Sequence, residues 1–201
     1  MKFHILLMAL LLPLLTSCAT TRSSGYGSRN GTPIFGSHNV DVEQMYQFVH
    51  SHNPAFDREV AQAFYDIGRL YGVRGDIALC QAIIETGWFR FDNGTAVRPE
   101  SHNYCGLGVR KNGQQGCRFD NVRDGVTAMI QHLYAYACAD DLPEGERLLD
   151  PRFRLVTRGS ARSWEALSGK WAMNPQYGNN ILKIYRQMKK HPVDRKNQDP
   201  K

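Results

Sequence analysis

Apolar residues recur every three or four positions through most of the chain, which is the spacing of helices that bury one face. Several of these segments follow an Asp, Asn or Ser, the residues that most often cap the first turn of a helix. The pattern predicts helices after Asp41, Asp57, Asn121 and Ser163, and a last helix that includes 181–188.

The segment 76–86 differs from the others because it is apolar on almost every side. Asp76 can cap it, and nearly every residue from there to Ile84 is apolar. Such a helix belongs in the interior of a domain rather than on its surface. The sequence therefore predicts a buried helix that ends in Glu85-Thr86-Gly87-Trp88-Phe89.

Glu85 is a candidate general acid because of its place at the end of this helix. A carboxylate there meets the negative end of the helix dipole and partly desolvated surroundings. Both effects raise its pKa and favour the protonated form that a general acid needs. Trp88 and Phe89 offer flat surfaces of the kind on which sugars stack. The alternative is a helix-ending glutamate that points into water, as most glutamates do.

Only the segment 104–119 indicates strands. Within it, Lys111-Asn112-Gly113 is a hairpin-turn signal between Cys105 and Cys117. Together with the helical segments, this predicts a mainly α fold (α+β, lysozyme-like in size). We expect a compact helical domain with a small β-hairpin lobe.

The N-terminus predicts a secretory signal followed by a lipid anchor. The apolar stretch 5–15 is too short to span a bilayer as a mature helix. It ends in Leu15-Thr16-Ser17-Cys18, which resembles the bacterial lipoprotein box, in which the cysteine is lipidated. The alternative is an ordinary cleaved signal with an incidental cysteine. A multiply acylated Cys18 would anchor the protein in the cell envelope, and the following Ala19 resembles sorting to the periplasmic face of a Gram-negative outer membrane.

Composition divides the 201 residues into four parts. After the signal and lipidated cysteine at 1–18, we expect a flexible Gly/Ser/Thr-rich linker over 19–40. A single domain of about 150 residues follows at 41–190, and a charged, solvated tail at 191–201.

The chain carries a formal net charge of +6, which falls to +5 when the signal and its Lys2 are removed. A modest positive excess suits a carboxylate-rich partner or an anionic surface, although many soluble domains carry a similar charge. Arg and Lys residues do not form a stripe interleaved with aromatic residues, so we expect no nucleic-acid partner.

Four cysteines remain in the mature chain, and in an oxidising envelope they permit two disulfides with three possible pairings. The hairpin turn places Cys105 opposite Cys117, and a second bond between Cys80 and Cys138 would join two helices. A zinc site needs clustered spacings such as C-x₂-C, which are absent. We expect neither a metal nor a cofactor.

A series of further motifs follows Glu85 along the chain. In order, they are Ser101-His102-Asn103-Tyr104-Cys105-Gly106-Leu107-Gly108, Phe119-Asp120-Asn121-Val122-Arg123-Asp124-Gly125, Asp150-Pro151-Arg152-Phe153, Gly159-Ser160-Ala161, Trp164, Lys170-Trp171-Ala172 and Tyr177-Gly178. In this order and spacing, the chain resembles the glucosaminidase domains of glycoside hydrolase family 73 over roughly residues 42–190. These are bacterial autolysins that cut the glycan strands of peptidoglycan at N-acetylglucosaminyl bonds.

The resemblance implies that Glu85 is the general acid that protonates the leaving glycosidic oxygen. It also implies that Tyr177 is the tyrosine that the family places near the acid in the active-site cleft. The alternative for Tyr177 is that it only starts a helix.

The resemblance also implies a set of substrate-binding residues. Asn103, Tyr104 and Gly106 match the family segment that opens the hairpin lobe and lines the cleft, although turn chemistry alone also explains this segment. Trp88 and Trp171 are either core residues or surfaces on which sugars stack.

The sequence departs from the resemblance at the second catalytic group. Most glycosidases pair the acid with a second carboxylate that acts as base or nucleophile. The hairpin tip at 110–117 contains no Asp or Glu, and the nearest acids are Glu100 and Asp120. The 2-acetamido oxygen of the substrate is an alternative nucleophile, with Tyr177 stabilising the intermediate.

The sequence therefore favours a peptidoglycan endo-β-N-acetylglucosaminidase. One alternative keeps the fold and the acid in a lytic transglycosylase or muramidase. Another is a non-catalytic lipoprotein that binds the cell wall, against which the retention of Glu85 argues.

Overall fold

The computed structural model describes residues 31–92, 97–109 and 115–194, and this part of the chain is mainly helical. The predicted mainly α class is confirmed. The α-helices of the described residues are α1 (Val42–His50), α2 (Arg58–Tyr71), α3 (Gly75–Thr86), α4 (Val122–Ala137) and α5 (Tyr177–Lys190). Short 3₁₀ turns occur at η1 (Pro99–Ser101), η2 (Phe153–Leu155) and η3 (Glu165–Leu167).

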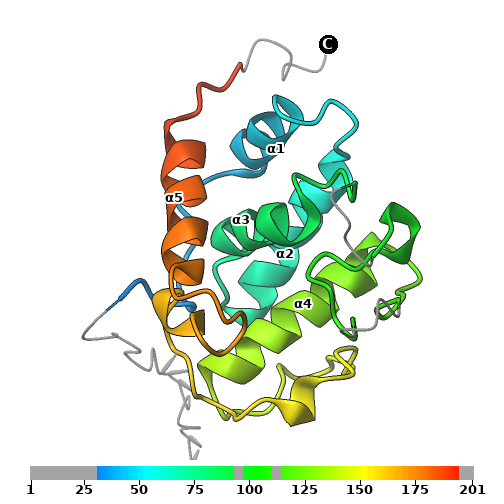
Figure 1. The fold of residues 1–201 in the computed structure, drawn as a ribbon, viewed down its shortest axis with the longest axis vertical. Helices are drawn as coiled ribbons and strands as arrows, with labels where there is room; N and C mark the ends of the chain where they lie inside the picture. Colours follow the sequence, from blue (N-terminus) through cyan, green and yellow to red (C-terminus); the bar gives the residue numbers. More distant parts are fainter. Residues whose placement is uncertain (1–30, 93–96, 110–114, 195–201) are drawn as a thin grey trace, which may run out of the picture.

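The apolar helix α3 lies in the centre of the domain (Figure 1). It packs between α2 and α5, while α4 packs on α2 and α1 packs on both α2 and α5. Residues Ile77 to Cys80 are all fully buried, as the all-round apolar pattern of this segment predicted. The centre of the domain is therefore the helix that ends in Glu85.

Side-chain caps begin three of the helices at the predicted residues. Asp41 accepts a hydrogen bond from the Gln44 backbone N–H (2.9 Å), and Asn121 accepts one from the Asp124 N–H (2.8 Å). Asp57 caps α2 in the same way through the Glu59 N–H (2.8 Å). These three predictions hold because each cap is formed by residues two or three positions apart.

Two predicted helix starts differ in the structure. The cap position of α3 is Arg74, and Asp76 is fully buried, where it pairs with Arg74 (3.2 Å) and accepts from the Asn39 N–H (3.0 Å). Ser163 accepts a hydrogen bond from the Ala166 N–H (3.3 Å), but only the 3₁₀ turn η3 follows instead of a helix.

The predicted flexible linker is too long at its C-terminal end. Residues 31–40 pack on the domain: Ile34 is fully buried, and its N–H donates to the Arg162 carbonyl (3.0 Å). The Thr32 N–H donates to Glu165 (2.8 Å). The tail also begins on the domain, because Asp194 and Gln47 exchange hydrogen bonds.

The predicted signal peptide with Cys18 and residues 19–30 lie outside the described residues, as does the end of the tail after residue 194. Within the described residues, no helix has the length and apolar character needed to cross a membrane.

The predicted β-hairpin is not found, because the described residues 97–109 and 115–119 contain no strand. The predicted turn at Lys111-Asn112-Gly113 lies outside the described residues. A buried amide joins the two arms of this lobe instead of a ladder of backbone hydrogen bonds. Asn103 Nδ2 donates to the carbonyls of Leu107 and Cys117 (both 2.9 Å), and the Leu107 carbonyl also accepts from the Cys117 N–H (2.7 Å).

The predicted disulfides are also absent, since Cys80, Cys105, Cys117 and Cys138 are all free thiols. Cys80 and Cys138 each direct their Sγ at a carbonyl one turn earlier in the chain, 3.4 Å and 3.6 Å away. Buried cysteines commonly take this place as small apolar residues. Cys105 lines the pocket that also contains Glu85, whereas Cys117 lines a separate pocket.

Candidate active site

Glu85 is the last residue but one of α3, and the chain turns sharply after it. Gly87 has a left-handed backbone (φ 60°), which costs glycine little. Trp88 and Phe89 are also left-handed (φ 62° and 59°), a conformation that costs about 1–3 kcal/mol for each non-glycine residue. Several hydrogen bonds hold this turn, and the carboxylate that precedes it therefore has a fixed position.

Thr86 is the residue that holds the turn from inside. It is fully buried, and its hydroxyl donates to the Ala82 carbonyl (2.7 Å) and accepts from the Phe89 N–H (2.9 Å). From outside, Asn53 Nδ2 donates to the Trp88 carbonyl (3.0 Å). The Thr-Gly-Trp-Phe sequence after Glu85 thus serves to form and hold this turn.

Two side chains from distant segments donate hydrogen bonds to one oxygen of Glu85. Trp171 Nε1 donates to Glu85 Oε1 (3.1 Å), and the Tyr177 hydroxyl donates to the same oxygen. Gln81, one turn before Glu85 in α3, donates from Nε2 to the Tyr177 oxygen (2.8 Å). Because the amide nitrogen can only donate, the Tyr177 proton must point at Glu85.

The pKa of Glu85 is raised above its ordinary value, and the cause is burial. The hydrogen bonds from Tyr177 and Trp171 favour the ionised form and offset part of this rise. Burial and the neighbouring Glu85 raise the pKa of Tyr177 well above the ordinary value, so its hydroxyl stays protonated and continues to donate.

Glu85 opens into a pocket of about 280 Å³ between the end of α3, the 97–109 segment and Trp171. A second pocket of about 240 Å³ adjoins the first, and Trp171 lines both. Four residues line both pockets: Cys105, Gly106, Val109 and Trp171. We call the two adjoining pockets together the groove; Glu85 lines the first pocket, and His132, Tyr136, Arg152 and Lys170 line the second.

The structure brings four of the predicted site residues together. Glu85, Gly106 and Trp171 line the groove, and Tyr177 lies behind Glu85, almost fully buried and without lining either pocket. Trp171 therefore both lines the groove and binds the candidate acid.

The other three predicted binding residues lie elsewhere. Trp88 stacks on His52 with ring centroids 3.8 Å apart, on the side of α1. Tyr104 is buried in the core between Phe64 and Phe89. Asn103 is fully buried, and its amide is occupied within its own loop, which matches the alternative of turn chemistry.

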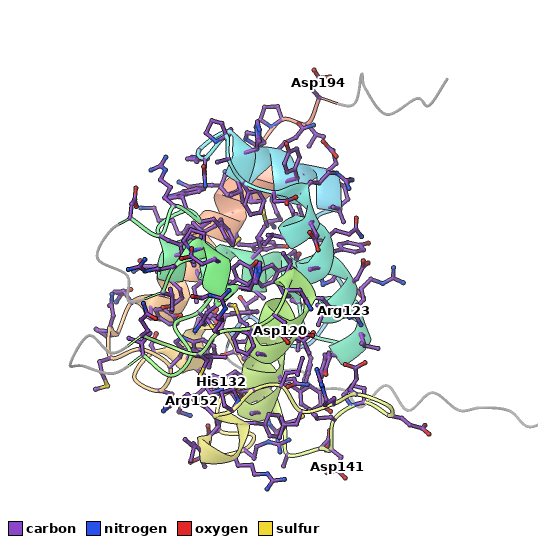
Figure 2. The ribbon with its side chains drawn as sticks, turned by 90° about the vertical axis from the view of Figure 1, so that its right-hand side faces the viewer. Asp120, Arg123, His132, Asp141, Arg152 and Asp194 are labelled. Atoms are coloured by element: carbon purple, nitrogen blue, oxygen red, sulfur yellow. The ribbon has the colours of Figure 1, made fainter. Side chains whose placement is uncertain are left out.

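Two features of the site are missed by sequence reasoning. The first is Gln81, whose role does not follow from the apolar pattern of its helix. The second is the buried pair of His132 and Asp150, in which Nδ1 lies 2.7 Å from Oδ2. His132 lies on α4 and lines the second pocket (Figure 2). Since an ionised Asp150 can only accept, Nδ1 of His132 carries the proton.

Among the described residues, Glu85 is the only carboxylate that lines the groove. Asp120 and Asp124 line the separate pocket that contains Cys117, and Glu100 is exposed on η1. In the same part of the chain, no three His, Cys, Asp or Glu side chains gather in a way that would hold a metal ion. In the described part of the chain, the groove thus contains one partly buried carboxyl group among polar side chains.

The chain is similar to several known proteins. The family model for glucosaminidase, described as mannosyl-glycoprotein endo-beta-N-acetylglucosaminidase, matches residues 61–190. An uncharacterized protein of Borreliella burgdorferi is 36% identical over 149 residues, which are 72% of this chain and 71% of the relative.

Two solved structures are also similar. The catalytic domain of the autolysin Auto from Listeria monocytogenes has a TM-score of 0.42 at 15% identity, over 73% of this chain and 85% of that one. Autolysin E of S. aureus, solved with a muropeptide, has a TM-score of 0.49 at 10% identity, over 81% of this chain and 76% of that one. Because the family model matches well over half of the chain and includes α3 with Glu85, the protein belongs to the glucosaminidase family of glycoside hydrolases.

Proposed function

We propose that this protein is an endo-β-N-acetylglucosaminidase that cleaves β-1,4 bonds in the glycan strands of peptidoglycan. The observation that carries the proposal is Glu85, which lines a groove and has a pKa raised by burial. A carboxyl group in such surroundings supplies the proton that the leaving sugar oxygen needs.

The hydrogen bonds to Glu85 indicate which of its two carboxyl oxygens carries the proton. Both Tyr177 and Trp171 donate to Oε1, and no described residue donates to Oε2. An oxygen that accepts two hydrogen bonds is a poor place for a proton, so the proton resides on Oε2. In the proposed reaction, Oε2 protonates the glycosidic oxygen, and the resulting carboxylate keeps two donors that stabilise its charge.

The second catalytic group is, in our proposal, the 2-acetamido oxygen of the substrate. The lining of the groove supports this, because among the described residues it contains no second carboxylate. The acetamido oxygen attacks the anomeric carbon as the glycosidic bond breaks, and water then opens the cyclic intermediate. The ionised Glu85 takes the proton from that water and returns to its starting state.

Mass spectrometry of the products tests this function. Purified protein incubated with peptidoglycan should release fragments that end in a reducing N-acetylglucosamine. Fragments ending in anhydromuramic acid would identify a lytic transglycosylase instead, and reducing muramic ends a muramidase. Binding to peptidoglycan without any released fragment would point to the non-catalytic cell-wall protein.

We also propose that Cys18 carries the lipid that attaches the enzyme to the cell envelope. Replacing Cys18 with Ser should move the protein from the membrane fraction to the soluble fraction of the envelope, because the acyl chains supply the membrane affinity. Immunoblots of separated fractions measure this, with the unchanged chain and a Ser17→Ala variant as controls. A Cys18→Ser variant that stays with the membrane would show that another segment binds it.

A further inference from the structure

The second half of the groove, beyond Trp171, differs in chemistry from the half that contains Glu85. Its polar lining residues are His132, Tyr136, Arg152 and Lys170, and we call this half the basic compartment. Figure 2 labels His132 on α4 and Arg152 on the segment that follows, close to each other in the lower part of the view. The basic compartment has a volume of about 240 Å³.

The positive charge of the basic compartment is not neutralised by its own lining. Arg152 is exposed, and its guanidinium forms no ion pair or hydrogen bond with the described residues. Lys170 is also exposed, and its Nζ donates to the Ser160 carbonyl, which leaves its charge in place. No carboxylate of the described residues lines this half.

Asp150 forms an ion pair with neither Arg152 nor Lys170. It is buried, with one oxygen on His132 Nδ1 (2.7 Å) and the other accepting from the Arg152 backbone N–H (2.8 Å). Asp150 therefore orients the His132 ring and fixes the backbone from which the Arg152 side chain starts.

The basic compartment is also joined to the reacting end of the groove. Trp171 donates to Glu85 from its indole nitrogen (3.1 Å), and its ring packs edge-on against His132 with centroids 4.8 Å apart. Gly106 and Val109 line both halves of the groove. These shared residues give a sugar chain bound at Glu85 a path into the basic compartment.

We propose that the basic compartment binds a carboxylate of the muramyl residue next to the cleaved bond, with Arg152 as its main partner. This proposal rests on the proposed function. N-acetylglucosamine is neutral, whereas the muramyl residue has a lactyl carboxyl group, which either is free or is linked to a stem peptide with carboxylates of its own. The fork of an arginine side chain matches a carboxylate, and few other groups in the glycan strand can pair with it.

The test combines an Arg152→Gln variant with substrates that differ only in charge. The substrates are intact peptidoglycan, the same material with its carboxyl groups converted to N-methylamides, and glycan strands stripped of stems by an amidase. We expect Arg152→Gln to lower kcat/KM on intact peptidoglycan about tenfold, the scale of one charge-assisted contact. On the methylamide substrate, the variant and the unchanged protein should be equally active.

The stripped strands distinguish the two sources of the carboxylate. In stem-bearing peptidoglycan the lactyl carboxyl is an amide, and the amidase frees it. A loss for Arg152→Gln on the stripped strands therefore means that the compartment accepts the lactyl carboxylate. If the loss occurs only with the stems present, the ligand belongs to the peptide. Arg154→Gln is the matched control, because Arg154 is exposed two residues away and lines neither pocket. It should behave like the unchanged protein on all three substrates.

Equal losses for Arg152→Gln on intact and methylamide peptidoglycan would overturn the proposal, since the arginine would then not be recognising charge. Co-sedimentation with insoluble intact or methylamide peptidoglycan repeats the comparison without turnover. If the unchanged protein releases no fragments, the proposed function fails by itself, while sedimentation still decides whether Arg152 senses a carboxylate.

Discussion

Replacing Glu85 with Gln should lower the rate of peptidoglycan cleavage by about 10² to 10⁴, the usual cost of losing a general acid. Glutamine has almost the same size, and its amide oxygen can still accept from Trp171 and Tyr177, so the site keeps its shape. It cannot supply a proton from the position of Oε2. The measurement is kcat from the release of soluble, reducing-end glycan fragments. Near-normal release by this variant would remove Glu85 from the mechanism.

The thermal stability of the same variant is its control. Burial raises the pKa of Glu85 in the fold, so above the pKa of an unfolded glutamate, about 4.3, the ionised carboxylate destabilises the folded state. Glu85→Gln should therefore melt at the same or a higher temperature at pH 7, and this gain should disappear as the pH falls below that value. Glu144→Gln, an exposed loop variant, should change neither rate nor melting temperature.

The parts of the fold that the sequence predicts well are those determined by neighbours along the chain. Asp57 and Asn121 cap helices through backbone N–H groups two and three residues later. The all-round apolar pattern of α3 needs no partner to be recognised, and it predicted both the burial of the helix and the raised pKa of Glu85. Local pattern thus gives the central helix and the candidate acid.

The parts that the sequence does not predict depend on contacts across the chain. Tyr177 meets Gln81 across 96 positions, and His132 meets Asp150 across 18, with no spacing rule that joins either pair. The turn signal between Cys105 and Cys117 predicted a hairpin closed by a disulfide. In the fold, however, the Asn103 amide occupies carbonyls of both arms, and the described residues 97–109 and 115–119 form no strand ladder.

Tyr177→Phe should be the most costly change at this site after Glu85→Gln, with a loss in kcat of about 10², the scale of a misplaced catalytic group. The phenol oxygen accepts from Gln81 and donates to Glu85, so its removal leaves the buried Gln81 amide without an acceptor and Glu85 with one donor fewer. Since that hydrogen bond lowers the pKa of Glu85, the alkaline limb of the pH–rate profile should also move to higher pH. Steady-state kcat measured across pH, alongside melting temperatures, gives both results.

The comparison set for this variant consists of Glu100→Gln, Asp120→Asn and Asp124→Asn. If the substrate's acetamido group is the nucleophile, each of these should cost at most about tenfold, well below the loss of a catalytic acid or base. Their positions outside the groove support the same expectation. If one of these three variants is as inactive as Glu85→Gln but melts at the normal temperature, the mechanism uses two carboxylates. The proposed attack by the acetamido group would then be wrong. A Tyr177→Phe variant with unchanged kcat and pH profile would reduce Tyr177 to a packing residue at the start of α5, and the proton on Glu85 would then be positioned by Trp171 alone.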